Sequence, residues 1–594
     1  MIILVKGEQG TFEHVTDQPI NLLHLLQEHD AEISAPCGGK GSCGKCRVNI
    51  VGVGSVLSCQ TVLCREWAEA NGIQPEQPLT IELPQYGKAQ ISSDGMMPEI
   101  VLAPLVNRGQ VQLEPASILD QRSNQQRFEE TSGLKIPYAL LPQLFKIINS
   151  GNNTIEFVFR RDTSEVTRFL RPDTKHVLSV AVDIGTTTLA AWLYDLETGE
   201  RLGVSSRYNP QRSFGADVIS RIEQIDHDIS NLQLMQKQIA DAISGMTEEM
   251  LTAAGLKSQD VHCLSISGNT TMMHILCGLN PTAISRSPFI PVSISEQLLR
   301  AVDLNIKISG DPICMLLPSI SAYAGADITA GIIACGLFRS ERASKLLVDL
   351  GTNGEIVLSR PGGMTACSTA AGPAFEAANI SCGMSGISGA IDRVWFEEGD
   401  IRYTVIGGVA PQGLCGSGLV SAVAALLQAG VIDDTGRLAD DPDELPEELS
   451  ARCSEVDGMN IFWLDRPGGK VYLSQRDVRE LQNAKAAVAA GVMRLLKQTG
   501  MHAEELDEIL LAGGFGYYLN VEDAYKIGLL PPGANDRTRA VGNTSGMGSI
   551  ACMLNDELRQ NAALAAASVE YYELSSDPIF TELYIEAMMF PEQE

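Results

Sequence analysis

The sequence lacks an uninterrupted apolar run long enough to cross a membrane. The longest apolar stretch, residues 418–432, is interrupted by Gly and Ser and falls short of the roughly 20 residues that a spanning helix needs. No basic region followed by a small-residue cleavage site accompanies the apolar start of the chain, so no secretory signal is expected. We therefore expect a cytoplasmic protein that does not enter a membrane.

Basic residues are few relative to acidic ones, at 44 Lys and Arg against 73 Asp and Glu, which gives a formal net charge of −29. Such a charge repels nucleic acid and anionic membranes, so neither is expected as a partner. The 594 residues hold 44% hydrophobic and 20% charged side chains, an ordinary balance for a globular protein of several domains. The acidic stretch 433–457 is predicted to be a solvated insertion without chemistry.

The fourteen cysteines lack the even spacing of a disulfide framework. Five lie before residue 65, and the other nine, from Cys263 to Cys552, are scattered singly through the chain. This usage is typical of buried, reduced thiols in a reducing compartment.

The N-terminal cysteines are the exception, because three of them lie within ten residues among four glycines. The spacing is C-x5-C-x2-C, followed by a fourth cysteine after twelve residues, which is close to the plant-type C-x4-C-x2-C…C pattern of [2Fe–2S] ferredoxins. Glycines let a loop curl tightly and present N–H groups to sulfur. The pattern predicts a [2Fe–2S] cluster held by Cys37, Cys43, Cys46 and Cys59.

Other uses of these thiols stay open. A four-cysteine zinc site would normally show two C-x2-C knuckles, and only one is present. A thioredoxin-like Cys43-x-x-Cys46 motif would leave Cys37 unexplained, and unligated thiols are improbable at this density. Cys64 is the alternative fourth ligand. Cys59 is preferred because Cys64 opens an expected helix over residues 65–70, where a thiolate would point along a regular surface.

The order of predicted elements indicates several domains. Two strands, a leucine-rich helix, the thiol loop and a late strand in residues 1–90 resemble the β-grasp fold of plant-type ferredoxins. Residues 91–125 are predicted to be a linker with short strands, and residues 126–176 a small α+β middle domain. From 177 to 594, strands alternate with helices and Gly-rich turns, which predicts an α/β domain.

A motif at the end of a buried strand occurs twice in this last domain. The strand 180–184 runs into Asp183-Ile-Gly-Thr-Thr-Thr, and the strand 346–350 runs into Asp349-Leu-Gly-Thr-Asn-Gly-Glu, which indicates two similar halves. Glycine allows close approach to a polyphosphate, threonine donates a hydroxyl, and aspartate holds Mg²⁺ through water. Two facing copies would clamp the phosphates of a nucleotide. A third strand, 508–512, ends in Gly513-Gly514-Phe515.

These motifs give a predicted ATP and Mg²⁺ site. The predicted catalytic residues are Asp183, Asp349 and Glu355. The predicted nucleotide contacts are Gly185, Thr186, Thr187, Thr188, Gly351, Thr352, Asn353 and Gly354, and the family resemblance given next implies that Gly513, Gly514 and Phe515 contact the adenosine.

The two motifs and the Gly-Gly strand end, in this order, resemble the ATPase superfamily of actin, hexokinase and heat-shock chaperones (ASKHA). Joined to the thiol loop, the chain resembles the reductive activators of corrinoid proteins. Further matching segments are 209–211, 215–221, 268–274, 371–376, 415–418 and 475–479. The resemblance implies an ATP-hydrolysing iron–sulfur reductase that passes an electron from its [2Fe–2S] cluster to an inactive Co(II) corrinoid protein. It also implies that the partner belongs to a methyltransferase system, and that a low-potential donor acts upstream; a homodimer stays open.

Two other functions remain open at this stage. A small-molecule kinase with a redox module would need a catalytic base between the halves, for which Asp349 is a candidate. A chaperone-like assembly factor would use its cluster structurally.

Several single residues and short segments also have two possible roles. The segment 268–271 either caps a helix or contacts nucleotide, and Gly416-Ser417-Gly418 either binds phosphate or forms a tight turn. We expect His274 to be a satisfied core histidine and Lys485 to be solvated.

Overall fold

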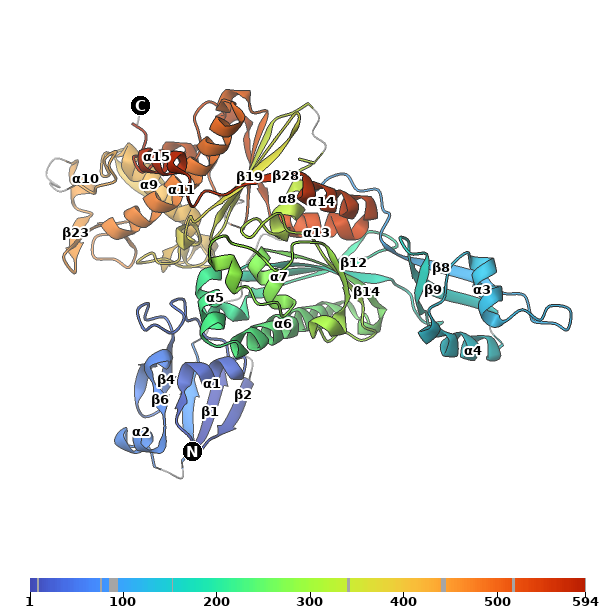
Figure 1. The fold of residues 1–594 in the computed structure, drawn as a ribbon. Helices are drawn as coiled ribbons and strands as arrows, with labels where there is room; N and C mark the ends of the chain where they lie inside the picture. Colours follow the sequence, from blue (N-terminus) through green and yellow to red (C-terminus); the bar gives the residue numbers. More distant parts are fainter. Residues whose placement is uncertain are drawn as a thin grey trace.

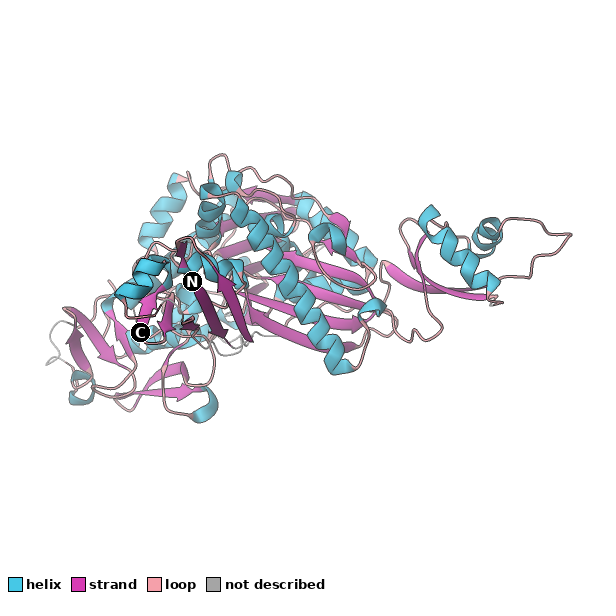
Figure 2. Cartoon of the chain, turned by 90° about the horizontal axis from the view of Figure 1, so that it is seen from below, coloured by secondary structure: helices cyan, strands magenta, loops and turns pink. Residues whose placement is uncertain are grey.

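The computed structural model describes residues 1–7, 10–74, 77–84, 94–151, 153–338, 342–439, 445–514 and 519–592. An N-terminal module lies against a large domain of two lobes, and a small domain projects from the large domain on another side (Figure 1). The view turned by 90° shows the same projection of the small domain (Figure 2). Within these described ranges, no helix combines the length and the apolar character that a membrane span requires.

The N-terminal module is a mixed five-stranded sheet in the order β2-β1-β7-β4-β5, with β1 parallel to β7. Helix α1 packs on this sheet, because Leu22, Leu25 and Leu26 share one core with Ile3 and Ile81. This is the arrangement of a β-grasp fold. The elements are β1 (Ile2–Gly7), β2 (Gly10–Val15), β3 (Ile20–Asn21), α1 (Leu22–Glu28), β4 (Arg47–Ile50), β5 (Gly54–Leu57), β6 (Val62–Leu63), α2 (Arg65–Ala70) and β7 (Leu79–Glu82).

The small domain is a three-stranded sheet in the order β10-β9-β8, covered by two helices around the buried Phe128. Its edge strand β8 lies inside the segment predicted as a linker. Only Val106 and Val111 of β8 are buried. The rest of the strand is polar, and for that reason its sequence was interpreted as part of a linker. The elements are β8 (Val106–Gln112), α3 (Asn124–Ser132), α4 (Leu141–Asn149), β9 (Thr154–Arg160) and β10 (Glu165–Phe169).

Backbone hydrogen bonds also fix the preceding part of the predicted linker to the large domain. Met96 N–H donates to Val541 O at 2.7 Å, and Ala103 N–H donates to Leu554 O at 2.9 Å. The described part of residues 91–125 therefore crosses the large domain and then enters the small domain, and it is not a free connection.

The first lobe contains a six-stranded sheet in the order β13-β12-β11-β14-β16-β15, in which β11 pairs antiparallel with β12 and parallel with β14. Its strands are β11 (Leu178–Ile184), β12 (Thr188–Asp195), β13 (Arg201–Tyr208), β14 (Val261–Gly268), β15 (Gln297–Arg300) and β16 (Ile313–Leu316). Its helices are α5 (Val218–His227), α6 (Ser230–Ala254), α7 (Thr270–Leu276) and α8 (Ala326–Ala334).

The second lobe repeats this plan in a sheet of order β27-β26-β17-β18-β19-β28, in which β17 pairs antiparallel with β18 and parallel with β26. Its strands are β17 (Lys345–Leu350), β18 (Gly354–Arg360), β19 (Gly363–Thr369), β26 (Glu508–Ala512), β27 (Thr538–Gly542) and β28 (Val569–Tyr572). Its helices are α11 (Gln475–Thr499), α12 (Val521–Lys526), α13 (Thr544–Leu554), α14 (Asp556–Ser568) and α15 (Pro578–Glu586). Five strands of the two sheets correspond, because β19-β18-β17-β26-β27 pair in the same directions as β13-β12-β11-β14-β16, and this confirms the predicted duplication. The sixth strand, β15 or β28, lies at opposite ends of the two sheets.

Smaller elements extend the second lobe at the side away from the small domain (Figure 1). They form two three-stranded sheets, in the orders β21-β20-β22 and β23-β24-β25. The elements are β20 (Ala390–Glu397), β21 (Asp400–Val405), β22 (Gly413–Leu414), α9 (Gly416–Gln428), α10 (Glu447–Ser450), β23 (Cys453–Val456), β24 (Met459–Trp463) and β25 (Tyr472–Ser474).

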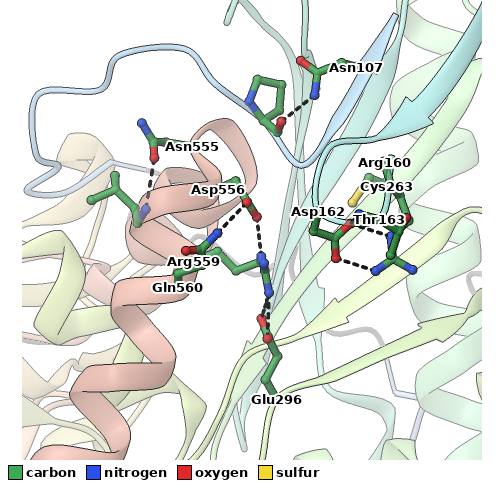
Figure 3. Close-up of polar contacts among 12 residues, drawn as sticks. Asn107, Arg160, Asp162, Thr163, Cys263, Glu296, Asn555, Asp556, Arg559 and Gln560 are labelled. Atoms are coloured by element: carbon green, nitrogen blue, oxygen red, sulfur yellow. Dashed lines mark hydrogen bonds and ion pairs between the residues drawn. The ribbon is translucent and has the colours of Figure 1, made fainter. Parts of the chain in front are cut away.

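Helices α8 and α13 lie between the two sheets and pack closely on each other. A Cβ atom at Gly548 would lie 2.0 Å from Ala330 O, so only glycine permits this approach. The lobes are also tied by charge, because Arg559 of α14 contacts Glu296 of the first lobe at 2.6 Å and Asp556 at 2.7 Å (Figure 3). Two carboxylates around a largely buried guanidinium fix the second lobe against the first.

Candidate functional site

A cleft of about 920 Å³ lies between the lobes. The hairpin turns that follow β11 and β17 both line it, as do the ends of β26 and β27. Of the predicted site residues, the cleft is lined by Asp183, Gly185, Thr186, Thr187, Thr188, Asp349, Gly351, Thr352, Asn353, Glu355, Gly513 and Gly514. Gly354 is not among the lining residues, because it packs against Val488 and Thr369. Phe515 lies outside the described residues.

Asp183 lies one residue before the end of β11 and is held by the start of α13. Its carboxylate accepts hydrogen bonds from Ser545 Oγ at 2.7 Å and from Asn543 Nδ2 at 2.9 Å. Burial raises the pKa of Asp183, and these two donors oppose that shift. The α13 residues were missed in the sequence, although Gly542-Asn543-Thr544 repeats the Gly268-Asn269-Thr270 that opens α7.

Four carboxylates gather in the cleft: Asp183, Asp327, Asp349 and Glu355. Burial, with the negative charges of Asp327 and Asp183, raises the pKa of Asp349 to about 7. Burial and the charge of Asp183 likewise raise the pKa of Asp327 to about 7, and burial with the charges of Asp327 and Asp349 raises that of Glu355. Mutually repelling carboxylates of this kind are a set that a divalent cation neutralises.

Asp327 was not predicted. It lies in the first turn of α8 and lines the cleft together with Asp183 of β11 and Asp349 of β17. The available signal was the sequence Gly325-Ala326-Asp327, which repeats the Gly215-Ala216-Asp217 at the start of α5.

The carboxylates do not form a direct cation cage. Across the described ranges, no three His, Cys, Asp or Glu side chains meet closely enough to hold an ion by themselves. Mg²⁺ keeps several of its waters in nucleotide sites, so oxygen ligands at this wider spacing fit a cation bound through water. A Mg²⁺ ion held through its waters stays a prediction for this cleft.

Glu376 joins the two hairpins across the cleft and was missed as a site residue. Its carboxylate accepts a hydrogen bond from Thr187 Oγ1 at 2.5 Å and another from Thr352 Oγ1 at 3.0 Å. Each of these hydroxyls belongs to one of the two predicted phosphate-binding turns. An anion therefore already lies between the turns, and it is supplied by the protein.

The structure also places the segments around Asn269, His274 and Gly416. Asn269 caps α7 through Oδ1 and donates from Nδ2 to Thr186 Oγ1 at 2.9 Å, so it serves both the helix and the cleft. His274 is a satisfied core histidine, as predicted: Nδ1 contacts Thr270 O at 2.7 Å and Nε2 accepts from Val292 N–H at 3.0 Å. Gly416 and Ser417 begin α9 and line the cleft.

Lys485 is not solvated, and the prediction for it was wrong. Its ammonium donates to Met589 O at 2.5 Å and lies 4.9 Å from the ring centroid of Phe590. Burial lowers its pKa to about 8. The C-terminal segment covers this face of α11. The sequence gives no sign of this contact, because the residues that make it lie about a hundred positions apart.

The four predicted thiol ligands form two pairs. Cys43 and Cys37 have their sulfurs 3.3 Å apart, and so do Cys46 and Cys59. A [2Fe–2S] cluster takes four cysteine thiolates, and the two pairs supply four: three from the glycine-rich loop and the fourth, Cys59, from the turn after β5. Within the described residues, no three of these sulfurs lie close enough together to hold a single ion. Gly38, Gly39, Gly41 and Gly44 of this loop all have positive φ, which explains why the loop needs glycine.

Cys64 has a different role in the structure. It is the N-cap of α2, and its sulfur accepts a hydrogen bond from Trp67 N–H at 3.4 Å. Cys59 instead lies in the 3-10 turn between β5 and β6, buried beside Cys46.

Two lobes on one strand plan, with a cleft lined by both hairpins, define an ATPase domain of the actin and hexokinase class. A family profile described as the C-terminal domain of RACo, the ASKHA domain, matches residues 343–594, and one described as the RACo middle region matches residues 178–340. The chain belongs to the family of reductive activators of corrinoid proteins, which confirms the predicted family, fold and enzyme class.

Three relatives illustrate this membership. The corrinoid activation enzyme RamQ of Eubacterium limosum is 31% identical over 589 residues, covering 95% of this chain and 96% of that protein. A solved structure called reductive activator for corrinoid, iron–sulfur protein has a TM-score of 0.76 at 29% identity, covering 99% of this chain and 98% of the other. The Co(II) methylated amine-specific corrinoid protein reductase of Methanosarcina barkeri is 28% identical over 252 residues, covering 38% of this chain and 42% of that protein.

Proposed function

We propose that this protein is an ATP-dependent reductive activator that returns an inactive Co(II) corrinoid protein to Co(I). The observation that carries the proposal is the presence, in one chain, of two pairs of thiols in a ferredoxin-like module and a two-hairpin cleft in an ASKHA domain. The corrinoid partner follows from the names of the relatives. We place that partner in a methyltransferase system, with a low-potential donor reducing this protein upstream.

The proposal assigns roles to the residues described above. Cys37, Cys43, Cys46 and Cys59 would hold a [2Fe–2S] cluster, which supplies one electron when bound. The hairpin hydroxyls of Thr187 and Thr352 would donate to the β- and γ-phosphates of ATP. Asp183, Asp327 and Asp349 would orient the waters of Mg²⁺, and Glu355 would position the water that attacks the γ-phosphate. Gly513 and Gly514 would lie beside the adenosine.

Energetics explain why such a chain combines the two sites. Plant-type clusters have reduction potentials of about −400 mV. A cluster at that potential does not readily reduce Co(II) to Co(I). Each ~59 mV of mismatch costs tenfold in a one-electron equilibrium. The cleft gives the chain a place where nucleotide binding and hydrolysis can offset that cost.

Anaerobic reduction of a corrinoid protein tests this proposal. With a low-potential donor and the full chain, we expect lasting Co(I) absorbance when Mg²⁺ and ATP are present. Omitting ATP, or using the Asp349→Asn variant, should lower the yield at least about tenfold, because the unfavourable step has nothing to drive it. Full Co(I) formation without nucleotide would contradict an energetic role of the cleft.

Glu376 gives a second expected result. Its carboxylate accepts from the two hydroxyls that the phosphates would need, so a charged Glu376 competes with ATP. Glu376→Gln removes the charge at the same size, and we expect ATP to bind about fivefold more tightly, or roughly 1 kcal/mol. Calorimetric titration with ATP measures the change. Glu376→Asp, which keeps the charge, is the matched control; weaker binding to the Gln variant alone would mean that the carboxylate assists phosphate binding.

A further inference from the structure

The loop that carries Cys37 is docked on the first lobe. Ala35 N–H donates to Arg212 O at 3.1 Å, and Ala216 N–H donates to Pro36 O at 3.2 Å. Gln224 Nε2 donates to Gly38 O at 3.0 Å, beside the place where α5 and α6 face the N-terminal module (Figure 1). A Cβ at Gly38 would lie 3.2 Å from Phe214 O, so the thiol loop and the lobe are in close contact.

The same part of the lobe holds the first phosphate-binding hairpin. Asn209 Nδ2 donates to Gly185 O at 2.8 Å, and Asn209 N–H donates to Thr187 O at 2.9 Å. Arg221, which is fully buried, donates to Thr186 O at 2.5 Å and to Gly215 O at 3.1 Å. Three successive hairpin carbonyls are thus fixed by the segment 209–221, and the thiol loop is bound to residues 212–216 of that segment.

Arg212 connects the module to the opposite lobe as well. Its guanidinium lies 3.3 Å from Glu32 Oε1 in the module and 4.3 Å from the ring centroid of Tyr208. The Tyr208 hydroxyl donates to Ser385 Oγ at 3.0 Å, and both residues line the cleft. Tyr208 comes from the first lobe and Ser385 from the second. Arg212 therefore contacts both the N-terminal module and Tyr208, the tyrosine that bridges the lobes.

We propose that Arg212 and Tyr208 are positioning residues that link nucleotide binding in the cleft to docking of the thiol loop. The inference rests on the proposed nucleotide function of the cleft. Phosphate oxygens that accept from the hairpin would order it, and with it the carbonyl contacts to Asn209 and Arg221. The segment 209–221 then holds the thiol loop more tightly. Because such coupling is reciprocal, a docked module would strengthen nucleotide binding by the same factor.

Hydrogen exchange tests the link in the full chain. The amide protons of Ala35 and Ala216 cross the interface and exchange when the module opens. We expect a non-hydrolysable ATP analogue with Mg²⁺ to slow their exchange at least about fivefold in the wild-type protein. Tyr208→Phe keeps the ring under Arg212 but removes the hydroxyl that reaches Ser385, and should lose most of this slowing. Arg212→Lys, which lacks the planar stacking group, should lose it too.

Lys237→Met is the matched control. Lys237 joins α6 to Asp30 of the same module but does not line the cleft. Lys237→Met should speed amide exchange at Ala35 and Ala216 in the absence of nucleotide. It should leave unchanged the ratio between the exchange rates without and with the analogue. Calorimetry on each variant establishes that the analogue binds. Unchanged exchange at Ala35 and Ala216 on binding, or equal loss of the ratio in Tyr208→Phe and Lys237→Met, would overturn the inference. No corrinoid protein is present, so the outcome is separate from that of the proposed function.

Discussion

Asp349→Asn should lower Mg²⁺-dependent ATP hydrolysis by about 10²- to 10³-fold, the loss typical of removing one preorganised electrostatic contact at a reacting phosphate. Asp349 lies one residue before the end of β17 and faces Asp183, Asp327 and Glu355 in the cleft. Asparagine keeps the shape of the side chain but cannot supply the charge that organises the cation and its waters. Steady-state phosphate release measures the change, and Asp183→Asn should behave in the same way.

Folding stability separates this effect from damage to the fold. The pKa of Asp349 is raised to about 7 by burial and by two neighbouring carboxylates, so the folded state binds this proton more tightly than the unfolded chain. Without Mg²⁺ and nucleotide, Asp349 therefore lowers the free energy of unfolding as pH rises from about 4 to about 7. The Asn variant lacks this loss, and near pH 7 it should melt no lower than the wild type.

A distant carboxylate provides the control. Asp173 pairs with Arg171 and Lys257 on an exposed surface, far from the cleft lining. Asp173→Asn should leave hydrolysis within about twofold of wild type, as expected for an exposed pair. Full hydrolysis in both Asp183→Asn and Asp349→Asn would refute the assignment of the cleft as the site of hydrolysis.

Cys59→Ser should lose most of the cluster signal, whereas Cys64→Ser should keep it. Anaerobically purified wild-type protein is expected to contain two irons and two acid-labile sulfides, and to give a [2Fe–2S] EPR signal on reduction. The Cys59 sulfur lies 3.3 Å from the Cys46 sulfur. Mutating a residue that only supports a metal ligand already lowers metal affinity about 10- to 100-fold, so replacing a direct ligand should lower it at least about tenfold.

Cys64→Ser is the matched control because the same atom is exchanged five residues away. The Cys64 sulfur caps α2, and a serine oxygen caps a helix at least as well, so we expect neither the signal nor the stability to fall. Iron content, labile sulfide and the EPR spectrum of both variants decide the matter. A signal retained in Cys59→Ser and lost in Cys64→Ser would reverse the ligand assignment.

Features that depend on neighbouring residues were predictable. Three of the four thiols and their glycines lie within ten residues, and each Asp-x-Gly-Thr turn comes at the end of its own strand. The duplication could be predicted because the motif itself is repeated. Asp327 and Glu376 were missed as site residues because the carboxylate and the hydroxyl that they meet in the cleft, those of Asp183 and Thr187, lie more than a hundred residues away in the chain.

The sequence by itself predicted the class of each site, four thiols with plant-type spacing and two turns suited to phosphate, since these patterns depend on local backbone chemistry. The tertiary structure decided which side chains share the cleft, because α8 and α13 bring Asp327, Asn543 and Ser545 to the end of β11. It also decided that Cys59 pairs with Cys46, and that the thiol loop rests on Arg212. Such contacts depend on how separate elements pack, and that packing leaves no pattern in the residues on either side of each contact.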